Sequence, residues 1–247
     1  PVSFQLFGLR EDAIKKSVEI IDDKADIIDF NFGCPAHQIV GSGSGSALLK
    51  RPEKMGKIIA TLVKHSSKPV TAKIRLGYDK NIVVKLAKII EENGADAIAI
   101  HGRTYKQGFS GQADWNAIAE AKEAVNIPVI GNGDIKTPKQ AEKLLKKCDA
   151  VMIGRAAIGD PMIFHRMNTY LKTGEVEQFP SFDEKLDSFL EYYKLGNKYD
   201  LINLHTLRQR AQEFTKGIRN SAVIRKELNK YDKVESMMKY IQSLKKI

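Results

Sequence analysis

Residues 27–35, Ile-Ile-Asp-Phe-Asn-Phe-Gly-Cys-Pro, form an apolar stretch that stops at a glycine and continues into a cysteine and a proline. The side chains of a β-strand alternate between its two faces. The polar and small residues of this stretch share one face: Asp29, Asn31 and Gly33. A parallel strand that is covered on both faces is usually a continuous run of Val, Ile and Leu. We therefore expect this face to border a polar cavity, with Cys34 at its edge.

The same alternation recurs in other apolar stretches, which are separated by single helical patterns and by a glycine-serine loop at 41–46. We predict strands over 2–8, 27–34, 70–77, 97–103, 128–134 and 150–155. Single helices between strands are typical of a parallel α/β architecture. Polar residues end every one of these strands. This favours a (β/α)8 TIM barrel over an open doubly wound sheet, whose functional residues gather at one switch point.

The last two strands end in Gly131-Asn-Gly-Asp134 and Gly154-Arg155, which are similar to the phosphate site that such barrels build after strands seven and eight. The six strands would then be strands three to eight, and the first two β/α units, about 60–70 residues, would be absent from this chain. A complete six-stranded open sheet is the alternative. We assign 1–162 to the barrel and 163–247, where the pattern is entirely helical, to a small second domain.

Charge and cysteine content narrow the class of protein. The chain has 247 residues, only two cysteines and a net charge of +10. Residues 201–247 hold eleven Lys and Arg against four acidic residues, which favours a polyanionic partner such as nucleic acid; a solvated helical surface is the alternative. No signal-peptide pattern and no apolar run of membrane-spanning length is visible. We expect a cytoplasmic protein without a membrane or metal site, and no protein partner is implied.

A polar cavity with cations and a phosphate cradle suits a phosphorylated planar ligand, and FMN fits this description. The Gln5 amide can meet the isoalloxazine edge, and Lys73 can stabilise the negative charge of reduced flavin. The other residues expected at this cavity are Asn31, His101, Arg103, Gly133, Gly154 and Arg155. A buried core histidine is the alternative for His101.

Cys34 beside such a ligand can act as an acid, because a thiol is mostly protonated at neutral pH. It would give a proton to a carbanion that forms next to a hydride acceptor. This predicts the reduction of a C=C bond in a ring that Asn31 positions. The alternative is that Cys34 is a small buried apolar residue, as most free cysteines are, and we expect this for Cys148.

Several motifs, in order along nearly the whole chain, resemble those of the tRNA-dihydrouridine synthases. They are Asp29–Pro35, Gly43–Leu49 with Pro52, Ala72–Gly77, His101–Gly111 with Ala113–Trp115, Ile130–Ile135 and Met152–Ala156. The resemblance implies an FMN-dependent reduction of uridine to 5,6-dihydrouridine in tRNA, with NADPH (or NADH) as the reductant. It also implies that Cys34 is the proton donor to uracil C5.

The remaining implied roles concern cofactor, substrate and RNA. The resemblance assigns flavin to Gln5, Lys73 and His101, the ribityl and phosphate groups to Asn132, Gly133, Asp134, Gly154 and Arg155, and the uracil to Asn31, Arg75 and Arg103. Arg208, Lys216 and Arg225 resemble the C-terminal signature and are assigned to tRNA. Two other functions stay open: a flavin-dependent dehydrogenase of a free pyrimidine, of the dihydroorotate type, and a non-catalytic tRNA-binding barrel.

Overall fold

A parallel sheet of six strands is the centre of the protein in a computed structural model that describes residues 1–176, 178–217 and 220–246. The strands are β1 (Ser3–Leu6), β2 (Ile27–Asn31), β3 (Val70–Arg75), β4 (Ala97–His101), β5 (Val129–Asn132) and β6 (Ala150–Met152). They pair in sequence order from β1 to β6, and every pairing is parallel. A doubly wound sheet would reverse its direction of growth, whereas this order adds each strand to the same edge, as a barrel does. The predicted parallel α/β fold is confirmed.

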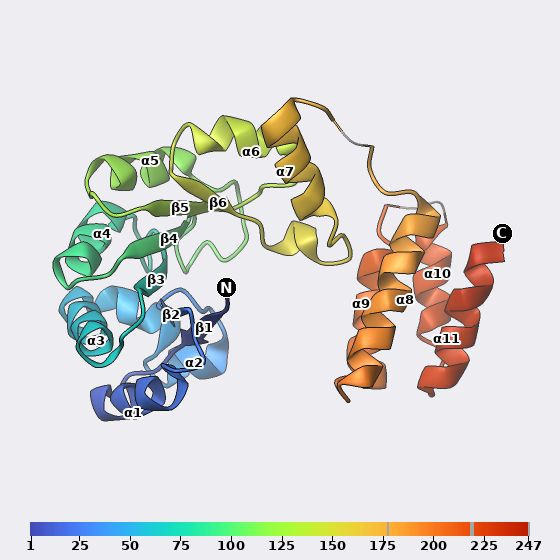
Figure 1. Cartoon of the computed structure of the whole chain (residues 1–247), viewed down its shortest axis with the longest axis horizontal. Coiled ribbons are helices and arrows are strands. Elements are labelled where there is room, and N and C mark those ends of the chain that lie inside the picture. The colour runs from blue at the N-terminus through green and yellow to red at the C-terminus, as the bar shows by residue number, and fades with distance from the viewer. Residues whose placement is uncertain (177, 218–219, 247) are drawn as a thin grey trace. The chain divides into compact units, whose positions relative to one another are not determined.

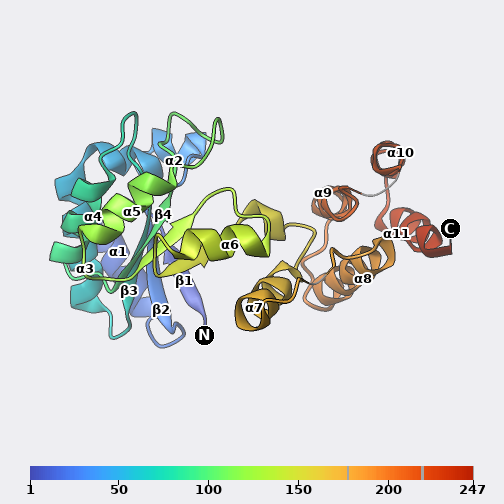
Figure 2. The same cartoon turned by 90° about the horizontal axis from the view of Figure 1, so that it is seen from above.

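Helices connect the strands, and those other than the short second helix lie along one side of the sheet (Figures 1 and 2). They are α1 (Glu11–Ile21), α2 (His37–Gly41), α3 (Pro52–His65), α4 (Val83–Glu92), α5 (Trp115–Glu123) and α6 (Pro138–Leu145). Along this layer α1 contacts α3, α3 contacts α4, and α4 contacts α5. The loop predicted at 41–46 is wrong in part. The helix α2 ends at Gly41, and a 3₁₀ helix spans Gly45–Lys50.

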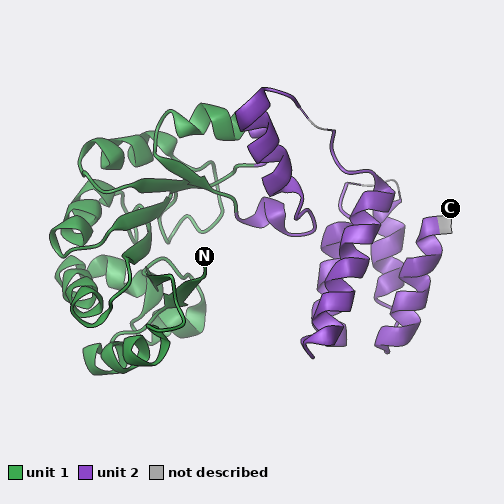
Figure 3. Cartoon of the chain, viewed as in Figure 1, with its two compact units in different colours: residues 1–135, 139–153 green, residues 136–138, 154–247 purple. Residues whose placement is uncertain are grey.

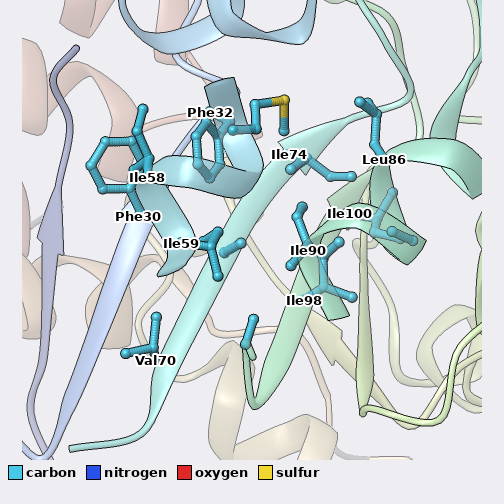
Figure 4. Close-up of a cluster of buried hydrophobic side chains, with 14 of the residues drawn as sticks. Phe30, Phe32, Ile58, Ile59, Val70, Ile74, Leu86, Ile90, Ile98 and Ile100 are labelled. Carbon is cyan, nitrogen blue, oxygen red and sulfur yellow. The ribbon is translucent and has the colours of Figure 1, made fainter. Parts of the chain in front are cut away.

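The hydrophobic core fills the space between the sheet and these helices (Figure 4). Phe30 of β2 and Phe32, which directly follows this strand, are fully buried, and their ring centroids lie 4.7 Å apart. Ile74 of β3 and Ile98 and Ile100 of β4 have the same parity and are equally buried. The apolar side chains of each strand therefore face the helices, which leaves the polar side chains on the opposite face.

The chain divides into two compact units, which Figure 3 distinguishes by colour. The first comprises residues 1–135 and 139–153, and the second comprises 136–138 and 154–247. The division at 153/154 precedes the boundary at 162/163 that the sequence suggested. None of the helices among the described residues is long and apolar enough to cross a membrane.

The second unit is built from helices in its described residues. They are a 3₁₀ turn at Arg155–Ala157, α7 (Ile163–Thr173), α8 (Phe182–Lys198), α9 (Leu204–Phe214), α10 (Ser221–Leu228), α11 (Val234–Ser243) and a 3₁₀ turn at Leu244–Lys246. Phe189, Leu207, Leu228 and Met237 lie in its own core. A capping box between Ser181 and Glu184 starts α8, and it fixes this end of the helix by satisfying backbone N–H groups.

Candidate active site

The strand register collects polar residues at three levels on the face of the sheet that the helices leave uncovered. Counted toward the carboxyl ends, the levels are Gln5–Asp29–Thr71, then Asn31–Lys73, then Arg75–His101–Asn132. Each set is aligned across neighbouring strands, because parallel strands in register place equivalent side chains side by side. The structure therefore brings together the site residues that the sequence predicted on β1 to β5.

A chain of hydrogen bonds connects the first two levels to the turn before Cys34. The Gln5 amide and the Thr71 hydroxyl each donate to a different carboxylate oxygen of Asp29, both at 2.6 Å. Asn31 Nδ2 donates to Gln5 Oε1 at 2.8 Å, and the Gly33 N–H donates to Asn31 Oδ1 at 2.9 Å. These bonds fix the orientation of both amide side chains relative to the end of β2.

Cys34 follows directly after this network as a half-buried free cysteine. The Gly33 carbonyl before it accepts from Arg75 Nε at 3.0 Å, and its own carbonyl accepts from the Ser46 N–H at 3.0 Å. Burial lowers the pKa of Lys73 and of Arg75, and a negative charge at Cys34 would oppose this shift at both cations. The cysteine is thus held by its backbone at the electropositive end of the site.

Lys73 differs from the other cations of the site because its ammonium has no hydrogen-bond or ion-pair partner in the part of the chain that the structure describes. Burial and the charge of Arg75 lower its pKa, and Asp29 opposes this shift. A half-buried cation without a partner is costly. It fits a ligand that brings a hydrogen-bond acceptor or a negative charge.

Arg75 and Arg103 hold the loop between β4 and α5. Arg75 Nη1 donates to the carbonyls of Thr104 and Gly108 at 3.2 and 3.0 Å. Arg103 donates to the carbonyls of Ser110 and Gly111 and forms an ion pair of 2.6 Å with Asp134. Both side chains are buried, and these partners compensate their charge. The structure thus gives both arginines a role in shaping the loop, while their predicted contact with uracil stays a prediction.

His101 is buried between these cations. Burial is the largest cause that lowers the pKa of His101, and the charges of Arg75, Lys73 and Arg103 add to it. Together they lower this pKa to about 3. The ring is therefore neutral near pH 7. Arg103 Nη1 lies 3.5 Å from His101 Nε2. Because a guanidinium only donates, this contact favours the tautomer with its proton on Nδ1.

The residues predicted to hold the ribityl and phosphate groups belong to different units. Asn132, Gly133 and Asp134 are part of the first unit, and Gly154 and Arg155 are part of the second. Asn132 donates its amide to the Met152 carbonyl at 2.8 Å, and the Gly133 carbonyl accepts from the Trp115 indole at 3.1 Å. Asp134, in the left-handed region at φ 58°, accepts from the Ala113 N–H at 2.9 Å. Gly154 and Arg155 are exposed and begin the second unit.

The residues predicted to contact RNA lie in the second unit and differ in their exposure and in their hydrogen-bond and ion-pair partners. Arg208 is half-buried and donates to the Tyr231 carbonyl. Lys216 is exposed and forms a 2.5 Å ion pair with Glu213. Arg225 is half-buried in α10 and makes no side-chain hydrogen bond or ion pair with the described residues. Lys216 and Arg225 are thus better placed than Arg208 to meet a phosphate.

The sequence of this chain is similar to that of known proteins. The family described as "Dihydrouridine synthase (Dus)" matches residues 1–246. A probable tRNA-dihydrouridine synthase of Rickettsia conorii is 40% identical over 232 residues, which cover 91% of this chain and 70% of the relative. The chain belongs to the dihydrouridine synthase family. This confirms the resemblance predicted from the motifs and makes the chain a member of an enzyme family.

A second relative has a similar name, and a solved structure shares the fold. A probable tRNA-dihydrouridine synthase of Aquifex aeolicus is 32% identical over an alignment of 254 positions, which covers 99% of this chain and 79% of the relative. The crystal structure of a ligand-free DHODH from Eimeria tenella has a TM-score of 0.53 at 15% identity and covers 67% of this chain and 57% of that one. At this identity the similarity concerns the fold alone.

Some residues of the site were given no role by the sequence. Asp29 accepts two hydrogen bonds that orient Gln5 and, through it, Asn31. The position of Asp29 on the polar face of β2 could have indicated this role, since a buried carboxylate needs hydrogen-bond donors around it. Ser46, which bonds the carbonyl of Cys34, lies twelve residues further along the chain, and no periodicity connects the two.

The low pKa of His101 affects stability in a definite direction. The unfolded chain would protonate this ring below its ordinary pKa of 6.5, whereas the folded protein protonates it only near 3. Between these values the unfolded state binds the extra proton, so the free energy of unfolding falls as the pH decreases, by up to about 1.4 kcal/mol per pH unit. Above 6.5 this contribution is fully present.

We expect the ring of His101 to stay neutral from pH 8 to pH 5. Histidine-labelled protein can be titrated by NMR, and the spectrum of His101→Gln identifies the signal. The His37→Gln variant, at an exposed position, controls for the loss of an imidazole as such. A His101 signal that titrates above pH 5 would contradict the shift.

Proposed function

We propose that this chain reduces uridine to 5,6-dihydrouridine in tRNA, with FMN as its cofactor and NADPH or NADH as the source of electrons. The observation that carries the proposal is the free Cys34 thiol beside Lys73 and Asn31, at the carboxyl ends of adjoining parallel strands. Family membership supports the reaction, because the relatives are named tRNA-dihydrouridine synthases. A free thiol also agrees with a cytoplasmic location.

FMN fits the polar face of the first unit. The unpartnered Lys73 ammonium suits a carbonyl that carries negative charge, and neutral His101 offers a donor at Nδ1. We propose that Gln5, Lys73 and His101 hold the ring system. When bound, a flavin supplies the hydride for reduction of a C=C bond. The ribityl and phosphate groups are assigned to Asn132, Gly133, Asp134, Gly154 and Arg155.

Cys34 holds the proton that the other carbon of the reduced bond requires. We propose that its Sγ gives this proton to uracil C5. Asn31, whose amide orientation is fixed by Gln5 and by the Gly33 N–H, positions the pyrimidine. Arg75 and Arg103 complete the proposed substrate side, where they shape the loop at 104–111.

The two parts of the chain divide the task in this proposal. Residues 1–162 form the catalytic part, with β1 to β6 as strands three to eight of an eight-stranded barrel; their sequential parallel order supports this. Residues 163–247 bind tRNA. A uridine inside folded RNA has to leave its stack before it can react, and basic helices grip the phosphate backbone with little sequence preference.

The reaction is tested with the two half-reactions under anaerobic conditions. Holoprotein with its flavin is reduced by NADPH and then mixed with unmodified tRNA while the flavin absorbance is followed. We expect tRNA to reoxidise the flavin and dihydrouridine to be present in the RNA. Reoxidation by a free pyrimidine but not by tRNA would instead indicate a metabolic dehydrogenase, and protein that never carries flavin would contradict the proposal.

The role of Cys34 predicts that Cys34→Ala separates these half-reactions. Reduction of the flavin by NADPH should be unchanged, and reoxidation by tRNA should slow by roughly 10²–10⁴, the usual effect of losing a positioned general acid. Stopped-flow absorbance measures both steps. Cys148→Ala, at the buried cysteine outside the site, is the matched control. Equal losses in both steps would contradict the assignment of Cys34 as the acid.

The RNA-binding role predicts that Lys216→Gln combined with Arg225→Gln weakens tRNA binding. The slope of log K against log salt should become shallower by about one for each lost phosphate contact. Affinities measured at several salt concentrations give this slope. Lys57→Gln with Lys85→Gln, two exposed positions on α3 and α4, removes the same charge and should leave the slope unchanged. An identical slope in both double variants would indicate that the C-terminal charge belongs to a solvated surface that does not contact tRNA.

A further inference from the structure

The backbone of Gly45 approaches Cys34 too closely for any other residue. This glycine opens the 3₁₀ helix Gly45–Lys50 and has a φ of +56°, in the left-handed region. A Cβ atom at this position would lie 2.8 Å from the carbonyl oxygen of Cys34 and 3.2 Å from its Cβ. It would also lie 2.8 Å from Cγ2 of Ile39. The contact with Cys34 is with backbone, which cannot rotate out of the way as the end of a side chain can.

The segment that carries Gly45 is firmly held. Leu48 and Leu49 of the same 3₁₀ helix are 0% and 1% exposed and belong to the core. Ser46 is fully buried, and its N–H donates to the Cys34 carbonyl at 3.0 Å. The turn before Cys34 is held from the other side, where Arg75 Nε donates to the Gly33 carbonyl. Cys34 is thus fixed between a core-anchored helix and a buried arginine.

We propose that Gly45 is a positioning residue for the proposed acid: its missing side chain lets the 3₁₀ helix press against Cys34 and hold the thiol at its reacting position. This inference rests on the proposed function of Cys34. Its physical basis is that proton transfer depends on placement, so a small displacement of the acid slows the reaction without removing the thiol.

The test is Gly45→Ala, measured by two independent readouts on the holoprotein. The first is the rate and pH profile of Cys34 alkylation by iodoacetamide, followed by mass spectrometry of the Cys34 peptide. We expect alkylation to be roughly fivefold faster, which corresponds to the loss of about one hydrogen bond from the turn. The second is flavin reoxidation by tRNA, which should slow by roughly tenfold or more because the acid is displaced, while reduction by NADPH is unchanged.

Two controls separate positioning from general damage. Gly174→Ala introduces the same kind of backbone strain, at φ +76°, where an added Cβ meets nothing within 4 Å; it should leave the rate of Cys34 alkylation at the wild-type value. Cys148, which is 9% exposed, is an internal reference in every sample, because its alkylation would rise if the first unit lost its packing. Ile39→Ala with Gly45→Ala relieves the contact with Ile39 and keeps the one with Cys34, so it should behave as Gly45→Ala does.

The outcomes distinguish this inference from the function on which it rests. Wild-type alkylation of Cys34 in Gly45→Ala, with Cys148 still protected, would overturn the positioning role. So would a wild-type rate in the double variant, because the contact with Ile39 would then be the cause. Changed alkylation together with an unchanged reaction with tRNA would contradict Cys34 as the acid, since the thiol would have moved without consequence.

Discussion

Three cations on one face of a parallel sheet, Lys73, Arg75 and Arg103, are the constraint on which the site depends. A buried charge is tolerated only when polar partners surround it. Arg75 and Arg103 find theirs in the carbonyls of the β4–α5 loop and in Asp134. The conformation of the loop therefore depends on the hydrogen bonds that its carbonyl oxygens accept from the two arginines. Burial, and after it the charges of the same three cations, lowers the pKa of His101 and keeps its ring neutral.

Lys73 is the exception to this balance. Its neighbours are used in fixed hydrogen bonds, Asn31 with Gln5 and Asp29 with Thr71, whereas its own ammonium has no partner among the residues that the structure describes. The protein itself satisfies the charges of Arg75 and Arg103, whereas Lys73 is left for the flavin that we propose as its partner. The rigid surroundings matter equally, since oriented groups do not have to reorganise when the ligand arrives.

The sequence predicted the strands and the polar face well, for a physical reason. Period-two alternation in β2, β3 and β4 is a local property, and it separates Phe30 and Ile98 from Asn31 and Lys73 without any knowledge of neighbours. Contacts between residues far apart in the sequence could not be predicted from this alternation. Nothing near Arg75 in the sequence indicates that its guanidinium would bind Gly33 and Gly108. The glycine-serine tract looked like a loop because its helical turns depend on burial of Leu48 and Leu49 rather than on propensity.

The hydrogen bond from the Trp115 indole to the Gly133 carbonyl has an optical consequence. Trp115 is the only tryptophan of the chain, and its ring packs against Gly131 of β5 so closely that a Cβ there would lie 2.3 Å from it. The tryptophan fluorescence of the whole protein therefore originates next to the end of β5. Any molecule that settles at this strand end, or absorbs near it, changes the brightness of a single known fluorophore, so the protein carries its own reporter at this position.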